Sequence, residues 1–167
     1  IASWTSQNMS LTMDVKLADV DKDGDLDILE SIANEPNYIY TFDGVVFGDV
    51  FWEPWASSDS GDSANSAWGD VDGDGDLDFV TADGVDGPLL YINGGHNLDD
   101  VNAWSDGTNS YSYSIDLGDM DNDGDLDLAI GNGNGEVSSV WKNNDNSFTM
   151  DWTSPSSRNF FAEDIIW

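Results

Sequence analysis

Three short segments carry Asp residues in almost the same pattern, and these segments are the part of the sequence best suited to chemistry. They are residues 19–27, 70–78 and 119–127. Each has Asp at its first, third, fifth, seventh and ninth positions and Gly at its sixth, and together they hold 15 of the 34 acidic residues. Alternate side chains of a tight loop point toward one centre, and Gly permits the sharp turn. The pattern therefore predicts loops in which carboxylates converge.

Converging carboxylates repel one another unless a cation lies between them. Calcium takes six to eight oxygen ligands in flexible geometry, whereas magnesium prefers fewer carboxylates and more waters. Zinc and copper prefer His or Cys, and the chain has one His and no Cys. We therefore expect about three calcium ions per chain, one per loop, with the seventh Asp offering its backbone carbonyl. The predicted metal-ligating residues are Asp19, Asp21, Asp23, Asp25, Asp27, Asp70, Asp72, Asp74, Asp76, Asp78, Asp119, Asp121, Asp123, Asp125 and Asp127.

The residues after each loop argue against an EF-hand or a dockerin. Those loops add an acid at position 12 and continue into a helix. Position 12 is Glu30, Thr81 and Ile130 in the three loops, and the residues that follow are β-branched and Gly-rich. We expect strands there.

The loops belong to a longer internal repeat. Their first Asp residues are 51 and 49 apart, and a Trp precedes each of them by 15 residues. The chain end continues the pattern, because Trp152 matches the earlier Trp residues and Trp167 matches Trp68. The repeating unit is thus about 50 residues long.

Short apolar runs fill each unit. They are rich in β-branched and aromatic residues and are separated by Gly and Asn turns, which is typical of strands. Four short strands in about 50 residues indicate one blade of a β-propeller. We predict an all-β chain with about three four-stranded antiparallel blades, forming a single repeat array over residues 1–167. Closed propellers usually need four to eight blades, so we expect a partial propeller that contacts further blades or associates with itself.

At this point the sequence resembles the FG-GAP/VCBS repeats, which form the blades of integrin-α-type propellers. The resemblance implies one calcium in the hairpin loop that joins the first two strands of each blade. It implies as side-chain ligands the first, third, fifth and ninth Asp of each loop, with backbone carbonyls from Asp25, Asp76 and Asp125. It also implies that ligands bind on the face away from the metals.

The amino-acid composition excludes several classes of binding partner. The formal net charge is −30 with only four basic residues, so the chain lacks the basic face that nucleic acids or anionic lipids require. No apolar run approaches the roughly 20 residues of a membrane span, which argues against direct membrane insertion. Cys is absent, and bound calcium can replace disulfides in an extracellular protein. We expect a secreted or cell-surface protein.

Three functions are consistent with these observations. The first is a non-enzymatic calcium-binding scaffold for adhesion or assembly, with an unknown protein or glycan ligand. A second is carbohydrate binding, as a lectin or as the non-catalytic part of a polysaccharide-degrading enzyme, although most Trp residues recur at repeat positions typical of a core and only Trp52 does not. A third is a filament subunit assembled head to tail. Catalysis is not expected, since His96 is the only His and no catalytic triad pattern exists. Asn8 begins a glycosylation sequon.

Overall fold

A computed structural model places most of the chain in strands and turns. It describes residues 10–42, 44, 55–59, 61–95, 98, 103–108, 110–144, 147–155 and 165–166. Trp4, the Trp that precedes the first loop by 15 residues, lies outside these residues, as do Asn8, Trp52, His96 and Trp167. Within the described part there is no helix, and so none that could cross a membrane.

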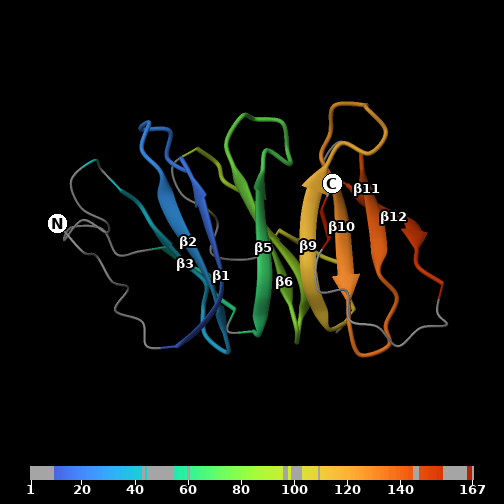
Figure 1. The fold of residues 1–167 in the computed structure, drawn as a ribbon. Helices are drawn as coiled ribbons and strands as arrows, with labels where there is room; N and C mark the ends of the chain where they lie inside the picture. The colour runs from blue at the N-terminus through green and yellow to red at the C-terminus, as the bar shows by residue number, and fades with distance from the viewer. Residues whose placement is uncertain are drawn as a thin grey trace.

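The described strands form three four-stranded antiparallel sheets, which lie side by side in Figure 1. Blade 1 contains β1 (Leu11–Ala18), β2 (Asp27–Ala33), β3 (Tyr38–Tyr40) and β4 (Trp55–Ala56). Blade 2 contains β5 (Ser63–Gly69), β6 (Asp78–Asp83), β7 (Gly87–Tyr91) and β8 (Trp104–Ser105). Blade 3 contains β9 (Ser112–Gly118), β10 (Asp127–Asn132), β11 (Ser139–Asn143) and β12 (Phe148–Thr153). Each blade is a meander in sequence order, which confirms the predicted all-β, blade-like architecture.

Strand register repeats from blade to blade. In blade 2 the row across the sheet is Trp68, Phe79 and Tyr91. The same row is Leu17, Ile28 and Tyr40 in blade 1 and Leu117, Leu128 and Trp141 in blade 3. Residues that match in the sequence repeat therefore occupy matching places in the sheets.

The core lies between neighbouring blades. We call the face that carries these rows the front of a blade and the opposite face its back. Phe79 and Tyr91 on the front of blade 2 pack in one cluster with Leu29 and Ile39 from the back of blade 1. In the same way, the front of blade 3 packs on the back of blade 2, in a cluster that includes Val80, Leu90, Ile115, Leu128 and Ile130. A blade buries its two apolar faces only when it has a neighbour on each side.

A series of hydrogen bonds holds the first strands of the blades together. The side chain of Asp14 accepts the backbone N–H of Ser66 at 3.0 Å. At the equivalent positions, Asn65 accepts the N–H of Ile115 at 3.1 Å, and Ser114 accepts the N–H of Ile165 at 2.8 Å. Ile165 thus stands to blade 3 as Ile115 stands to blade 2. This placement matches the sequence prediction that the chain end continues the repeat.

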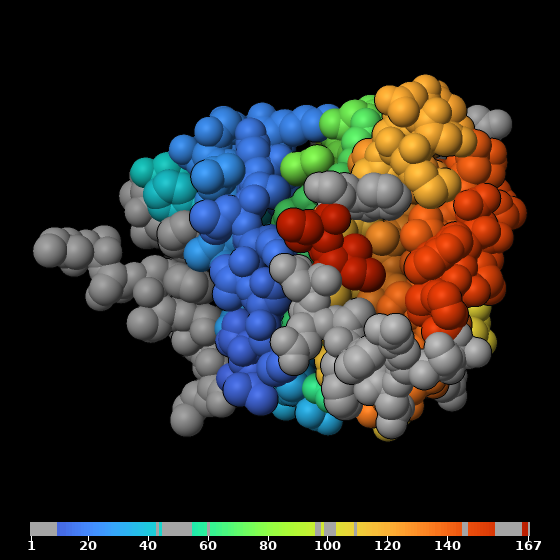
Figure 2. Space-filling model, turned by 45° about the vertical axis from the view of Figure 1, so that its right-hand side comes forward, coloured from blue at the N-terminus to red at the C-terminus, as the bar shows by residue number. Residues whose placement is uncertain are grey.

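The front of blade 1 is exposed along its first strand, whereas Ile32 and Tyr40 on the same face are buried. Its first strand exposes alternate apolar side chains, namely Leu11 (66%), Met13 (48%), Val15 (53%) and Leu17 (59%). Strand β1 lies at the surface in Figure 2, in dark blue.

Trp152 departs from the sequence expectation. Its repeat position predicts a core residue, as Trp55 and Trp104 are, because each of those packs against rings of the following blade. Trp152 is instead 50% exposed. The described part of the chain has no fourth sheet to cover it.

Candidate metal centres

Each Asp-rich loop joins the first two strands of a blade. The loops lie between β1 and β2, between β5 and β6, and between β9 and β10. All three emerge at the same end of the molecule, the upper end in Figure 1. A strand rather than a helix follows every loop, which separates them from EF-hand sites.

The loop backbone needs two residues with positive φ. Gly at the sixth position has φ of +98° at Gly24, +90° at Gly75 and +100° at Gly124, as its place in the sequence predicts. The fourth position is also left-handed, at Lys22 (61°), Gly73 (75°) and Asn122 (60°). Gly and Asn tolerate this conformation and Lys does so poorly, so the fourth position of the first loop is the most strained.

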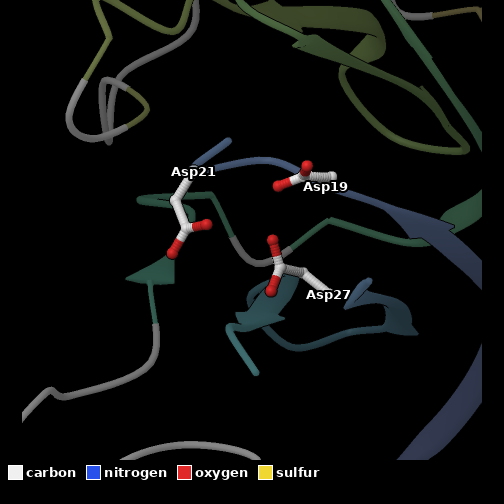
Figure 3. Close-up of side chains that lie close together, drawn as sticks. All are labelled: Asp19, Asp21 and Asp27. Atoms are coloured by element: carbon white, nitrogen blue, oxygen red, sulfur yellow. The ribbon is translucent and has the colours of Figure 1, made fainter. Parts of the chain in front are cut away.

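The loops bring three carboxylates together in each blade. In the first loop, oxygens of Asp19, Asp21 and Asp27 all lie within 4.8 Å of one another. Figure 3 shows these three side chains facing one shared space. The same spacing holds for the other two triads, Asp70, Asp72 and Asp78, and Asp119, Asp121 and Asp127. The first, third and ninth positions therefore converge in every copy.

The ninth Asp fixes each loop to its blade. Both oxygens of the buried Asp27 accept backbone N–H groups, from Val20 at 2.8 Å and from Phe42 at 2.8 Å. Asp78 accepts from Val71 at 2.7 Å and Asn93 at 2.8 Å, and Asp127 accepts from Met120 at 2.8 Å and Asn143 at 2.9 Å. Each ninth Asp thus links the start of its loop to the end of the third strand.

Two Asn residues extend this link to the neighbouring blade. The side-chain amide of Asn93 donates to the carbonyl of Val20 in the first loop at 3.3 Å, and that of Asn143 donates to the carbonyl of Val71 in the second loop at 3.0 Å. Sequence reasoning missed them. The available signal was their spacing of 50 residues, equal to the repeat.

The first Asp supplies a test of whether a cation fits. One oxygen of Asp19 accepts the N–H of Gly24 at 3.1 Å, and the corresponding oxygen of Asp70 accepts that of Gly75 at 3.0 Å. The other oxygen, Oδ1, is buried in both residues and has no hydrogen-bond partner. A buried carboxylate oxygen without a partner is costly. A cation between the three carboxylates would satisfy it, so the donor set fits a hard metal ion.

The family comparison agrees with this geometry. The chain matches the FG-GAP-like repeat over residues 19–81 and again over residues 70–130. Each match begins at the first Asp of a loop and ends in the strand after the next loop, and together they span about two thirds of the chain. The chain belongs to the FG-GAP-like repeat family. No curated protein matches it.

The fifth and seventh Asp residues of these FG-GAP-like repeats lie outside the triads. The fifth Asp accepts the N–H of the seventh in each loop, at 2.9 Å for Asp23, 2.8 Å for Asp74 and 3.1 Å for Asp123. Asp76 at the seventh position forms an ion pair with Lys22 of the preceding loop. Of the 15 predicted residues, the structure therefore gathers the first, third and ninth of each loop and holds the others around them.

Burial acts on the carboxyl pKa values of the first two loops. Burial raises the pKa of Asp78 to about 6, with the nearby carboxylate of Asp72 adding to the effect. Burial also raises the pKa values of Asp21, Asp27 and Asp72. In the third loop the N–H of Asp125, followed by the ammonium of Lys142, lowers the pKa of Asp123. The three FG-GAP-like loops can hold metal ions.

Proposed function

We propose that this chain is a calcium-binding, non-enzymatic scaffold of the extracellular space, serving adhesion or assembly. The observation that carries the proposal is the same carboxylate triad built in three consecutive blades. The buried, unpartnered oxygens of Asp19 and Asp70 support a cation at the centre of the first two.

The donor chemistry favours calcium. Every triad offers only carboxylate oxygens, and we expect the backbone carbonyl of the seventh loop residue to add to them. Calcium accepts such sets with variable geometry, whereas magnesium demands an octahedron with several waters. Calcium sites of extracellular modules bind at roughly 10⁻⁴–10⁻³ M, so they fill outside cells. The match to FG-GAP-like repeats, which are typical of extracellular proteins, supports the same location.

Calcium would act on the contacts between blades. The ninth Asp of a loop holds the backbone of Asn93 or Asn143, and the side chain of that Asn holds the preceding loop. An ion on Asp78 therefore fixes a residue that also positions the loop of blade 1. Ions that bind only the folded state stabilise it by mass action.

The aromatic side chains favour a scaffold over a sugar-binding surface. Trp55 and Trp68 pack against the cluster between blades 1 and 2, and Trp104 and Trp141 pack against the cluster between blades 2 and 3. Rings that are half-buried in this way offer less free surface for stacking on a sugar. Trp152 is the exception among the described Trp residues, at 50% exposure.

Thermal unfolding tests the calcium function. We expect the melting temperature to rise by roughly 10 °C or more between EDTA and 5 mM calcium, because several ions bind the folded state alone. Magnesium at the same concentration should raise it less. Asp72→Asn should reduce the calcium response, while Asp151→Asn, an exposed acid on β12, should leave it unchanged. An identical melting curve with and without calcium contradicts the proposal.

A second candidate function is assembly of copies through the first strand of blade 1. The exposed residues of β1 are Leu11, Met13, Val15 and Leu17. The counterparts of Val15 and Leu17 in blade 3 pack in the cluster between blades 2 and 3. An apolar face of this kind marks an interaction site, and we propose that a second copy of this chain covers it. Sedimentation should then show a concentration-dependent oligomer that Val15→Lys abolishes. Thr149→Lys, on the exposed part of β12, should leave the oligomer intact. A monomer at all concentrations refutes this function.

A further inference from the structure

The three metal loops differ in structure although their sequences are nearly the same. In the first two loops, Oδ1 of Asp19 and of Asp70 is buried without a partner. In the third loop, Oδ1 of Asp119 accepts the N–H of Asp123 at 3.2 Å. In the third loop, Oδ1 of the first Asp therefore has a hydrogen-bond partner, which the same atom lacks in the first two loops.

A lysine also lies on the third loop. Nζ of Lys142 forms ion pairs with Oδ2 of Asp121 and, at 3.2 Å, with Oδ2 of Asp123. Asp121 belongs to the carboxylate triad. The ammonium group thus already neutralises charge that an ion would neutralise.

The other blades have no counterpart to this lysine. Strand register aligns Trp141 with Tyr91 and Tyr40, so the residues equivalent to Lys142 are Ile92 and Thr41. Lys22 does reach toward the second loop, where it forms its ion pair with Asp76 outside the triad and attracts Asp70 of the triad only through space. Only the third triad, among the three, has a described ion pair with a lysine.

Exposure points the same way. The third triad has two exposed members, Asp119 and Asp121, whereas the first has one, Asp21, and the second has none. Solvent therefore screens the third triad more strongly and weakens its attraction for a cation.

We propose that Lys142 is a tethered competing cation that makes the third loop the weakest of the three calcium sites. The inference rests on the proposed calcium function and adds an order of filling to it. An ion that binds all three carboxylates of the third triad competes with the ammonium for Asp121 and with the N–H of Asp123 for Asp119. The sites in blades 1 and 2 therefore bind calcium first as its concentration rises, and the site in blade 3 binds it only at higher concentration.

Calorimetric calcium titration of the whole chain tests this order. The wild type should show two tighter ions and one weaker ion. In Lys142→Met, which keeps the length of the side chain without its charge, the weakest site should bind about three- to tenfold more tightly, because two ion pairs no longer compete. Lys142→Arg restores the charge and should behave like the wild type.

Lys16→Met is the matched control, because Lys16 pairs with Asp14 at 3.3 Å on β1 and touches no loop carboxylate in the ion pairs of the described residues. It should leave all three affinities unchanged. Unchanged affinities in both Lys142→Met and a second variant, Lys142→Gln, overturn the inference while the calcium function stands. Absence of any bound calcium in the wild type and the variants alike overturns the calcium function itself.

Discussion

At the scale of single residues, the ninth Asp of each loop combines two roles. It belongs to the carboxylate triad and accepts two backbone N–H groups. Asp78 is fully buried, and the pKa of its carboxyl is raised to about 6 because burial disfavours the charge. Without a cation, the folded chain therefore holds protons that the unfolded chain would release.

This predicts an inverted pH dependence for the metal-free protein. An acid whose pKa is higher in the folded than in the unfolded state stabilises the fold at low pH and ceases to do so as pH rises through the folded value. Asp78, Asp27 and Asp83 all shift upward, and the net charge of −30 adds self-repulsion as pH rises. In EDTA we expect the melting temperature to fall as the pH rises from about 4 to 7.

Saturating calcium should reverse that trend, because the ion binds deprotonated carboxylates and its affinity rises with pH. Melting curves recorded at each pH with EDTA and with calcium provide the check. A metal-free protein that becomes steadily more stable between pH 4 and pH 7 would show that the buried carboxylates do not determine how its stability depends on pH.

At the scale of elements, Asn93 joins two blades. Its side-chain amide donates to the carbonyls of Val20 and Leu77, both at 3.3 Å, and its backbone N–H reaches Asp78. Asn93→Ala keeps the backbone contact and leaves the two carbonyls without this donor. We expect unfolding to become easier by about 1–3 kcal/mol, measured by urea denaturation in calcium.

Asn144→Ala is the control for that variant, because Asn144 is exposed and its described bonds use only the backbone. It should change stability by less than about 0.5 kcal/mol. Equal losses in the two variants would mean that Asn93 does not couple the blades.

Many features of the strands and loops could be predicted from the sequence, because the same pattern occurs in three copies. The Gly at the sixth loop position, the strand after each loop and the core role of Trp55 and Trp104 were all predictable from spacing. Lys142 was not, since its place on the third loop depends on the register between β10 and β11. The prediction that Trp152 is a core residue was wrong, because this repeat position is buried only where a following blade covers it.

At the scale of the whole molecule, the chain is a row of blades with different ends. Blade 1 exposes apolar side chains along β1, and Ile165 begins to repeat the inter-blade contact beyond blade 3. The interior blade interfaces are apolar, whereas the loop edge collects acids. The three acidic loops therefore lie at one edge of the molecule, and cations bound there would offset the repulsion between neighbouring blades.

The location of bound ions tests the central claim most directly. Crystals grown in calcium can be measured at a long X-ray wavelength, where calcium scatters anomalously. Calcium sites predict three anomalous peaks per chain, one inside each carboxylate triad, with the peak beside Lys142 the weakest at limiting calcium. A map with no peak at the triads around Asp27 and Asp78, at millimolar calcium, would contradict the account.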